Sequence, residues 1–129
     1  MLRRIVFSSR SIGAGGLSTV SLAHILGAAE RNNRRDQITG GMVLHGDRIL
    51  HAMEGPALEI GRAMARIHAD PRHTEVQVLV DQTVAVRALA EPMRLCDDPE
   101  AFLAGLNVRT LDEVTAEAAQ AELDRRLAA

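Results

Sequence analysis

Amide, imidazole and guanidinium side chains that can hydrogen-bond to a planar, polar-edged ring occur in three short segments of this chain. The segments contain Asn32 and Asn33, then His51, then Asp70, Arg72 and His73. An asparagine side chain both donates and accepts hydrogen bonds, and an arginine donates to carbonyl or phosphate oxygens. These residue types predict a site for a ring with carbonyl and imide groups. Nothing among them resembles a catalytic acid–base pair.

The elements that must position these side chains alternate between strands and helices. Leu2 to Ser8 is short, β-branched and apolar, which is typical of a strand. Pro56 suits the first turn of a helix, and Asp70 ends that helix because the residue before a proline avoids the helical region. The other expected elements begin with a loop over Ser9 to Gly16, a helix from Ser18 or Thr19 to about Arg31, and a hairpin of Ile38 to Leu44 with Arg48 to Met53. Two strands are expected next, Thr74 to Val80 and Val84 to about Leu89, joined through Asp81-Gln82. The last two elements are a helix from Asp98-Pro99 to Leu106 and a helix that starts at a capping box over Thr110 to Glu113.

The order of these elements predicts an α+β fold. The first six follow the ferredoxin-like order βαββαβ, and an extra strand and two helices come after them. In that topology the first and third strands are adjacent in the centre of the sheet, the crossover helices cover one face, and the C-terminal helices can pack on the other. Alternation along the strands places Phe7 beside His51, beneath the crossover helices. We expect residues 1–95 to form the core and residues 96–129 a helical extension of the same domain.

Composition narrows the class of protein. The chain has 129 residues, a net charge of −2 and one cysteine, Cys96. This charge argues against nucleic-acid binding, and a single thiol is compatible with a reducing cytoplasm. No apolar run approaches the ~20 residues that a membrane span needs, and the N-terminus lacks the apolar core of a signal peptide. We therefore expect a cytoplasmic protein with neither a membrane nor a nucleic acid as partner.

A known family carries a similar set of segments at a similar spacing. Asn32-Asn33-Arg34-Arg35-Asp36-Gln37-Ile38-Thr39-Gly40-Gly41, Met53-Glu54-Gly55-Pro56 and Asp70-Pro71-Arg72-His73 together resemble the signature of the BLUF family, small flavin-binding domains that sense blue light. The resemblance covers roughly residues 2 to 95. It implies that a flavin, usually FAD, lies between the first two helices. Asn33 would then contact the isoalloxazine ring, and Asn32, Asp70, Arg72 and His73 would be auxiliary flavin contacts.

Two positions depart from the family pattern where its photochemistry takes place. In the family, light drives electron and proton transfer from a tyrosine on the first strand to the ring, and a glutamine rearranges its hydrogen bonds. This chain has Phe7 and His51 at those positions, and it contains no Tyr or Trp at all. A phenyl ring has no dissociable proton, and an imidazole lacks the bifunctional amide of glutamine. The late family pattern Arg-x-Phe-x-x-Trp-x-Met is also altered, with Leu89 and Pro92 in place of its aromatic residues.

The resemblance leads to a main hypothesis and an alternative. The main hypothesis is a sensory or regulatory module that binds FAD without the usual blue-light photocycle, forms a homo-oligomer and signals to a separate protein partner. The alternative is a flavin-free interaction or assembly module of the same fold, in which Phe7, Met53 and Met64 close the pocket. A flavin enzyme is the weakest hypothesis, so we expect no enzymatic activity.

Plainer structural interpretations of the same residues remain open. Asn32-Asn33 can simply end a helix, and His51 on an apolar strand face can be a hydrogen-bonded core histidine. The Gly13 to Gly16 loop lacks the spacing of a dinucleotide-binding motif. The five histidines and Cys96 match no metal-ligand spacing, so we expect no metal site.

Overall fold

A computed structural model describes residues 1–11, 19–70 and 73–128, and within them it leaves the side chains of residues 11, 19–25, 73 and 126–128 undescribed. It contains a five-stranded sheet in the order β4-β1-β3-β2-β5. The strands are β1 (Leu2–Ser11), β2 (Thr39–His45), β3 (Arg48–Pro56), β4 (His73–Val84) and β5 (Arg94–Leu95). The first four are antiparallel to one another where they pair, and β5 runs parallel to β2. The predicted ferredoxin-like α+β fold is confirmed.

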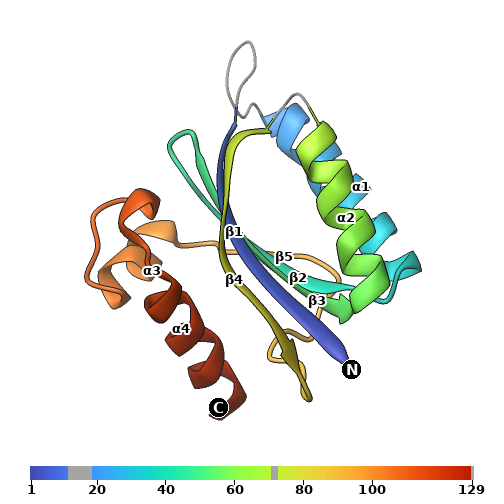
Figure 1. The fold of residues 1–129 in the computed structure, drawn as a ribbon. Coiled ribbons are helices and arrows are strands. Elements are labelled where there is room, and N and C mark those ends of the chain that lie inside the picture. The colour runs from blue at the N-terminus through green and yellow to red at the C-terminus, as the bar shows by residue number, and fades with distance from the viewer. Residues whose placement is uncertain (12–18, 71–72, 129) are drawn as a thin grey trace.

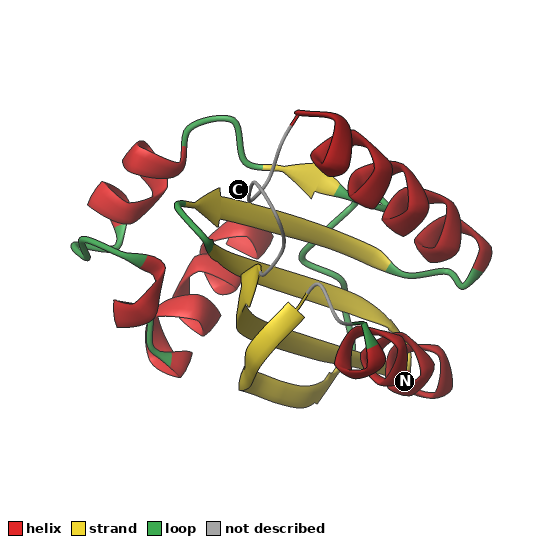
Figure 2. Ribbon diagram, turned by 90° about the horizontal axis from the view of Figure 1, so that it is seen from above, coloured by secondary structure: helices red, strands yellow, loops and turns green. Residues whose placement is uncertain are grey.

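The helices form two layers on opposite faces of the sheet (Figures 1 and 2). One layer holds α1 (Thr19–Arg35) and α2 (Ala57–Ala69). The other holds α3 (Pro99–Gly105), a 3-10 helix at Leu111–Glu113, and α4 (Ala116–Ala128). The expected packing of the C-terminal helices on the second face is therefore correct. In the described part of the chain, no helix is both long and apolar enough to cross a bilayer.

Alternating residues of the strands build a separate core on each face. The core beneath α1 and α2 includes Ile5, Phe7 and Met53 from the sheet, with Ile60 and Met64 from α2. The core beneath the C-terminal helices consists of Val6, Val43, Leu50, Val80, Leu103, Leu111, Val114, Ala119 and Leu123. Consecutive residues such as Val6 and Phe7 thus belong to different cores, because successive strand side chains point to opposite faces.

The β2–β3 turn and the end of α2 form where the sequence predicts them. The β2–β3 turn passes through Gly46, whose φ of 62° is easily adopted without a Cβ. Asp70 follows α2 in an extended conformation, and its N–H donates to the Ile67 carbonyl at 3.2 Å. Two bounds are wider than expected, since β1 continues to Ser11 and α1 to Arg35.

The predicted strand from Val84 to Leu89 is wrong. Asp81-Gln82 does not form a turn, and β4 continues through it to Val84, which pairs with Leu2 of β1. Asp81 pairs with Ile5 of β1 in the sheet, and Arg3 of β1 donates to its carboxylate, with Nε–Oδ1 at 2.9 Å and Nη2–Oδ2 at 2.8 Å. The fifth strand is instead the short β5, at the other edge of the sheet.

The predicted capping box for the last helix is also wrong. Thr110 makes no side-chain cap, and the Glu113 carboxylate accepts from the backbone N–H of Arg109 at 2.7 Å. The turn therefore closes after one 3-10 segment. α4 starts separately at Ala116, where Thr115 Oγ1 accepts from the N–H of Ala118 at 3.1 Å.

Candidate functional site

The centre of the candidate site is a contact between two rings on neighbouring strands. Phe7 on β1 and His51 on β3 are register partners. Their ring centroids lie 5.0 Å apart, with the ring planes tilted by 50°. His51 is 6% exposed and Phe7 is completely buried. The structure thus brings together the two side chains that strand alternation placed side by side.

A cleft of about 250 Å³ lies between α1, α2 and the sheet, over His51. Alanines line it on both helices, with Ala28 and Ala29 on α1 and Ala63 on α2. The floor belongs to the sheet, where Met42 joins His51. Because alanine side chains are short, the two helices leave a slot between them that is suited to a flat molecule.

Polar side chains line the cleft where the two helices end. Asn32 and Asn33 come from the last turns of α1, and Arg66 and Asp70 come from the end of α2 and the residue after it. The cleft thus gathers four of the residues that the sequence singled out: Asn32, Asn33, His51 and Asp70. Amide, guanidinium and carboxylate groups at its rim can bind the polar edge of a ring whose body lies among the alanines.

Of the other three predicted residues, only Phe7 has a described side chain. Phe7 belongs to the core beside His51 and does not line the cleft itself. Arg72 lies outside the described residues. His73 is described only as the first residue of β4, paired with Ser11 of β1, and its side chain is not described. The expected flavin contacts of Arg72 and His73 therefore stay predictions.

Asn33 joins the cleft to the segment that follows β4. Its side chain is 5% exposed, and Nδ2 donates to the Pro92 carbonyl at 2.7 Å. Its own backbone carbonyl accepts from the N–H of Ile38 at 2.8 Å, near the end of α1. The alternative interpretation, that Asn32-Asn33 ends the helix, is wrong, because α1 continues to Arg35 and the residue with positive φ after it is Gln37.

The sequence reasoning missed Arg66 and the alanines of the slot. Ala63, Arg66, Ile67 and Asp70 have the i, i+3, i+4 and i+7 spacing of a single helix face, and all four line the cleft. That spacing could have placed Arg66 beside Asp70. The alanines gave no signal, because alanine suits every face of a helix.

Asp36 connects the two helices at this end of the cleft. Its Oδ1 accepts from Arg35 Nε at 2.9 Å, and its Oδ2 accepts from Arg66 Nη2 at 3.2 Å. The hydrogen bond from Arg35 holds the pKa of the Asp36 carboxyl below its ordinary value, and the charge of Arg66 acts in the same direction. The Asp36 carboxylate thereby links α2, through Arg66, to the C-terminal end of α1, through Arg35.

We expect the stabilisation from Asp36 to disappear in acid. Because the pKa is lower in the folded state, its contribution is present above the ordinary carboxyl pKa and is lost as the pH falls through the folded value. Urea unfolding of the wild type and Asp36→Asn should therefore differ near pH 7 and converge below about pH 3. Equal differences at both pH values would contradict this role of the carboxylate.

Gly40 lets β2 approach β3 closely beside the cleft. A Cβ at this position would lie 2.9 Å from the backbone carbonyl oxygen of Ala52, and 3.7 Å from both Asn33 Nδ2 and His51 Nε2. A separation of 2.9 Å from a backbone atom requires the strands to shift. The neighbouring Gly41 differs, because the nearest atom to a Cβ there is the Arg94 carbonyl oxygen at 3.6 Å.

Gly40→Ala should lower the free energy of unfolding by about 1–3 kcal/mol, as overpacking does. Because the β2–β3 shift occurs beside Asn33 and His51, the same change should also alter the cleft. Gly41→Ala is the matched control, and we expect it to have little effect in the same urea titration. Equal unfolding midpoints for the two variants would contradict the close approach.

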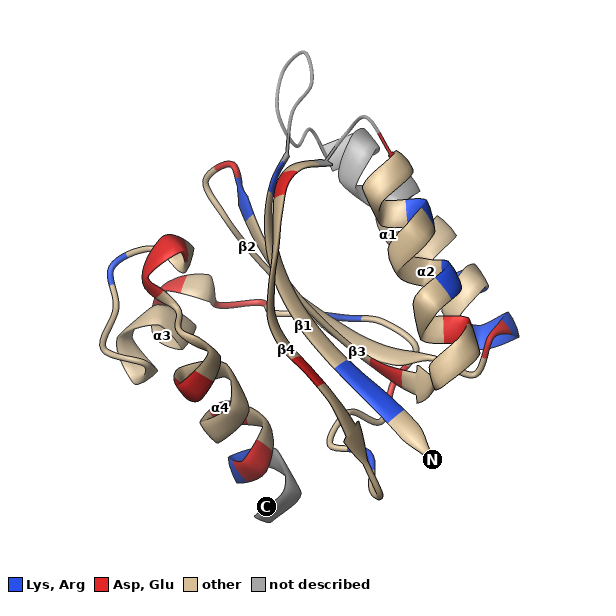
Figure 3. Cartoon of the chain, in the orientation of Figure 1, with Lys and Arg blue, Asp and Glu red and all other residues tan. Residues whose placement is uncertain are grey.

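The segment after β4 is fixed to the sheet by hydrogen bonds to the carboxylate and to the backbone carbonyl of Glu54 in β3. Glu54 is completely buried on the face beneath the C-terminal helices, and its carboxylate accepts from the N–H groups of Ala88 and Leu89 at 2.7–3.1 Å. Arg4 Nε donates to the same carboxylate at 2.9 Å. Arg87 Nη1 donates to the backbone carbonyl of Glu54 at 2.9 Å. Figure 3 shows these oppositely charged segments of β1 and β3 close together.

Metal binding has no support in the described residues. Their His, Cys, Asp and Glu side chains do not gather in groups of three that could hold an ion.

A family model described as "BLUF: Sensors of blue-light using FAD" matches residues 2–93 of this chain. The comparison with curated proteins found no match.

Solved structures with the same fold include two chains of similar length and a longer adenylyl cyclase. BlrB, a BLUF protein in its dark state, is 27% identical with a TM-score of 0.84, over 98% of this chain and 95% of its own. BlsA in its photo-activated state is 18% identical with a TM-score of 0.83, over 100% of this chain and 96% of its own. A bacterial light-regulated adenylyl cyclase is 22% identical with a TM-score of 0.72, over 83% of this chain. This chain spans 34% of that cyclase.

Proposed function

Because this chain belongs to the BLUF family, sensors of blue light that use FAD, we propose that it is a sensory module whose flavin ring lies in the slot between α1 and α2. The observation that carries the proposal is the alanine-lined cleft over His51, with amide and charged groups at its rim. A volume of about 250 Å³ is close to the lower end of the usual range for small-molecule sites. It suits the ring of a flavin better than a whole dinucleotide.

The residues present fit such a ring. Asn32 and Asn33 offer amide donors and acceptors for ring carbonyl and imide groups, and Arg66 offers a guanidinium. We further propose that Asp70, Arg72 and His73 form auxiliary contacts, as the family resemblance implies. When bound, FAD supplies the absorption of blue light and a ring that accepts an electron.

The chain's own residues oppose the family's light reaction. By the family resemblance, Phe7 is at the position of the tyrosine that donates an electron and a proton. A phenyl ring has no dissociable proton and is a very poor electron donor. No Tyr or Trp occurs elsewhere to replace it. His51 is the register partner of Phe7. A ring nitrogen of His51 can donate or accept a hydrogen bond, but imidazole lacks the carboxamide of glutamine, which has both a carbonyl acceptor and an NH₂ donor. We propose that flavin binding is retained and that the ordinary photocycle is absent.

A visible spectrum of the purified protein, before and after incubation with FAD, tests the proposal. We expect the absorption band of oxidised flavin to remain with the protein after gel filtration, and blue light to produce no reversible red shift. Asn33→Ala should reduce FAD retention, because it removes the one buried amide at the cleft. A protein that stays colourless with added FAD would overturn the assignment.

The alternative is a flavin-free interaction module of the same fold. It is favoured by the complete burial of Phe7, the near-complete burial of Met53, and the engagement of Asn33 Nδ2 by the Pro92 carbonyl. In both cases we propose a cytoplasmic protein that acts through a separate partner or a second copy of itself. Sedimentation of the protein with and without FAD would report self-association.

A further inference from the structure

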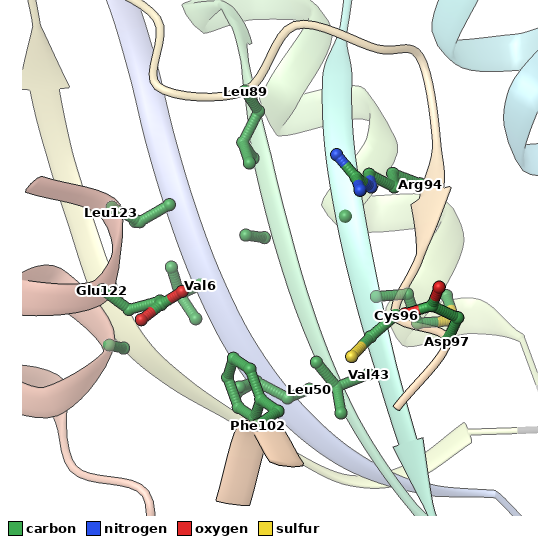
Figure 4. Close-up of a pocket in the computed structure, with 14 residues that line it drawn as sticks. Val6, Val43, Leu50, Leu89, Arg94, Cys96, Asp97, Phe102, Glu122 and Leu123 are labelled. Carbon is green, nitrogen blue, oxygen red and sulfur yellow. The ribbon is translucent and has the colours of Figure 1, made fainter. Parts of the chain in front are cut away.

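A second cavity lies on the opposite face of the sheet, beneath the C-terminal helices. It measures about 210 Å³, and among the described residues it shares with the cleft under α1 and α2 only Met42 of β2. Figure 4 shows aliphatic side chains and the Phe102 ring arranged around it, with Leu123 and Glu122 on one side and Arg94, Cys96 and Asp97 on the other. The proposed flavin site lies on the opposite face of the sheet from this space.

Small residues create the cavity. Gly41 of β2 and Ala52 of β3 are register partners on this face, and Ala119 of α4 lines the same space. Gly41 is not required by the backbone, since its φ lies outside the left-handed region and a Cβ would meet no atom closer than 3.6 Å. Glycine within a strand weakens it and commonly marks the close approach of another group. The absence of a side chain at Gly41 therefore serves to leave space.

The lining indicates what this space can accept. Its walls are mainly apolar, while the charged residues Arg94 and Asp97 are exposed and Glu122 forms an ion pair with Arg125 of α4. Arg94 and Asp97 carry opposite charges, and the charge of Glu122 is neutralised by Arg125, which lies outside the lining, so the described lining gives little net attraction to an ion. An apolar cavity of about 150 Å³ stays dry and accepts benzene. A cavity of about 210 Å³ is therefore large enough for a one- or two-ring molecule.

We propose that this cavity binds a small uncharged aromatic or alicyclic molecule, and that the bound molecule holds α4 on the sheet. Leu123 and Ala119 of α4 line one side of the cavity, and Gly41 and Ala52 of the sheet line the other. A ligand between them gains both sets of contacts only while α4 is docked. By mass action, occupancy stabilises the docked arrangement. The proposal is independent of flavin binding, because it concerns the opposite face.

Indole is a suitable uncharged two-ring probe. The chain has no Trp and no Tyr, so the fluorescence of added indole can be followed with little protein background. We expect saturable binding at one site, with a blue shift of the indole emission. Backbone amides of residues 118–123 should exchange with deuterium more slowly when indole is bound. The carboxylate analogue indole-2-carboxylate should bind far more weakly, because its charge would be desolvated.

Matched variants locate the bound probe. Ala52→Leu fills the cavity and should abolish indole binding, whereas Ala65→Leu, exposed on α2, should leave it unchanged. Gly41→Ala adds one methyl where contacts are ordinary, so it should fold and bind indole more weakly. The proposal is overturned if wild type shows no saturable binding. It is equally overturned if FAD displaces the probe while Gly41→Ala and Ala52→Leu leave binding unchanged, since the probe would then occupy the other cleft.

Discussion

Glu54→Ala is expected to lower the free energy of unfolding by about 3–5 kcal/mol, the usual cost of breaking a buried ion pair. Glu54 and Arg4 have side-chain exposures of 0% and 2%, and Arg4 Nη2 lies 2.9 Å from Glu54 Oε2. Removing the carboxylate leaves a buried guanidinium uncompensated. It also leaves the N–H groups of Ala88 and Leu89 without their acceptor. Urea unfolding followed by circular dichroism measures the loss.

Asp81→Ala provides the matched control for this prediction. Asp81 also receives two hydrogen bonds from an arginine, Arg3, but the two side chains are 45% and 33% exposed. An ion pair in that setting contributes about 0–1 kcal/mol. If Glu54→Ala lowers the free energy of unfolding by no more than Asp81→Ala does, burial does not determine how much these ion pairs contribute to stability. Arg4→Met with Glu54→Leu should recover part of the loss, because no charge is then left unpaired.

The same carboxylate has a consequence at the cleft. Glu54 fixes Ala88 and Leu89, and the chain from there reaches Pro92, whose carbonyl accepts from Asn33 Nδ2. A loosened segment would change the partner of the buried amide. We therefore expect Glu54→Ala to alter FAD retention as well as stability, although Glu54 does not line the cleft.

The sequence was sufficient where the signal was local or came from a known topology. Strand alternation and the ferredoxin-like order placed Phe7 beside His51 without any knowledge of side-chain contacts. The turn at Gly46 and the end of α2 before Pro71 follow from backbone preferences of glycine and proline. The turn and the helix end depend on residues close together in the chain, and the Phe7–His51 pair depends on a topology that the order of elements already indicates.

The sequence failed where contacts are distant in the chain. Asp81-Gln82 has the composition of a turn, but both residues pair with β1 in the sheet, and Arg3, 78 residues away, donates to the Asp81 carboxylate. β5 has two residues, too few to show an alternating pattern, and its pairing with β2 gives it direction. The Arg4–Glu54 pair joins residues 50 apart, and nothing in either neighbourhood indicates that both charges are buried.

The Phe7→Tyr, His51→Gln variant, loaded with FAD, should gain a reversible red shift under blue light that the wild type lacks. The two positions are register partners with rings 5.0 Å apart, so a phenol and an amide introduced there would be neighbours. The phenol restores a donor of an electron and a proton, and the amide restores a group that both donates and accepts hydrogen bonds. Light-minus-dark absorption spectra measure the gain.

Each single change should give less than the pair. Phe7 is completely buried, so Phe7→Tyr alone introduces a hydroxyl that costs about 1–3 kcal/mol unless it finds a partner. His51→Gln can supply that partner, so the unfolding free energies of the two changes should not add. Phe102→Tyr, on the opposite face, is the control: it adds a tyrosine remote from the cleft and should give no light response. A yellow double variant that shows no spectral shift would mean that Phe7 and His51 are not what separates this cleft from a working photoreceptor.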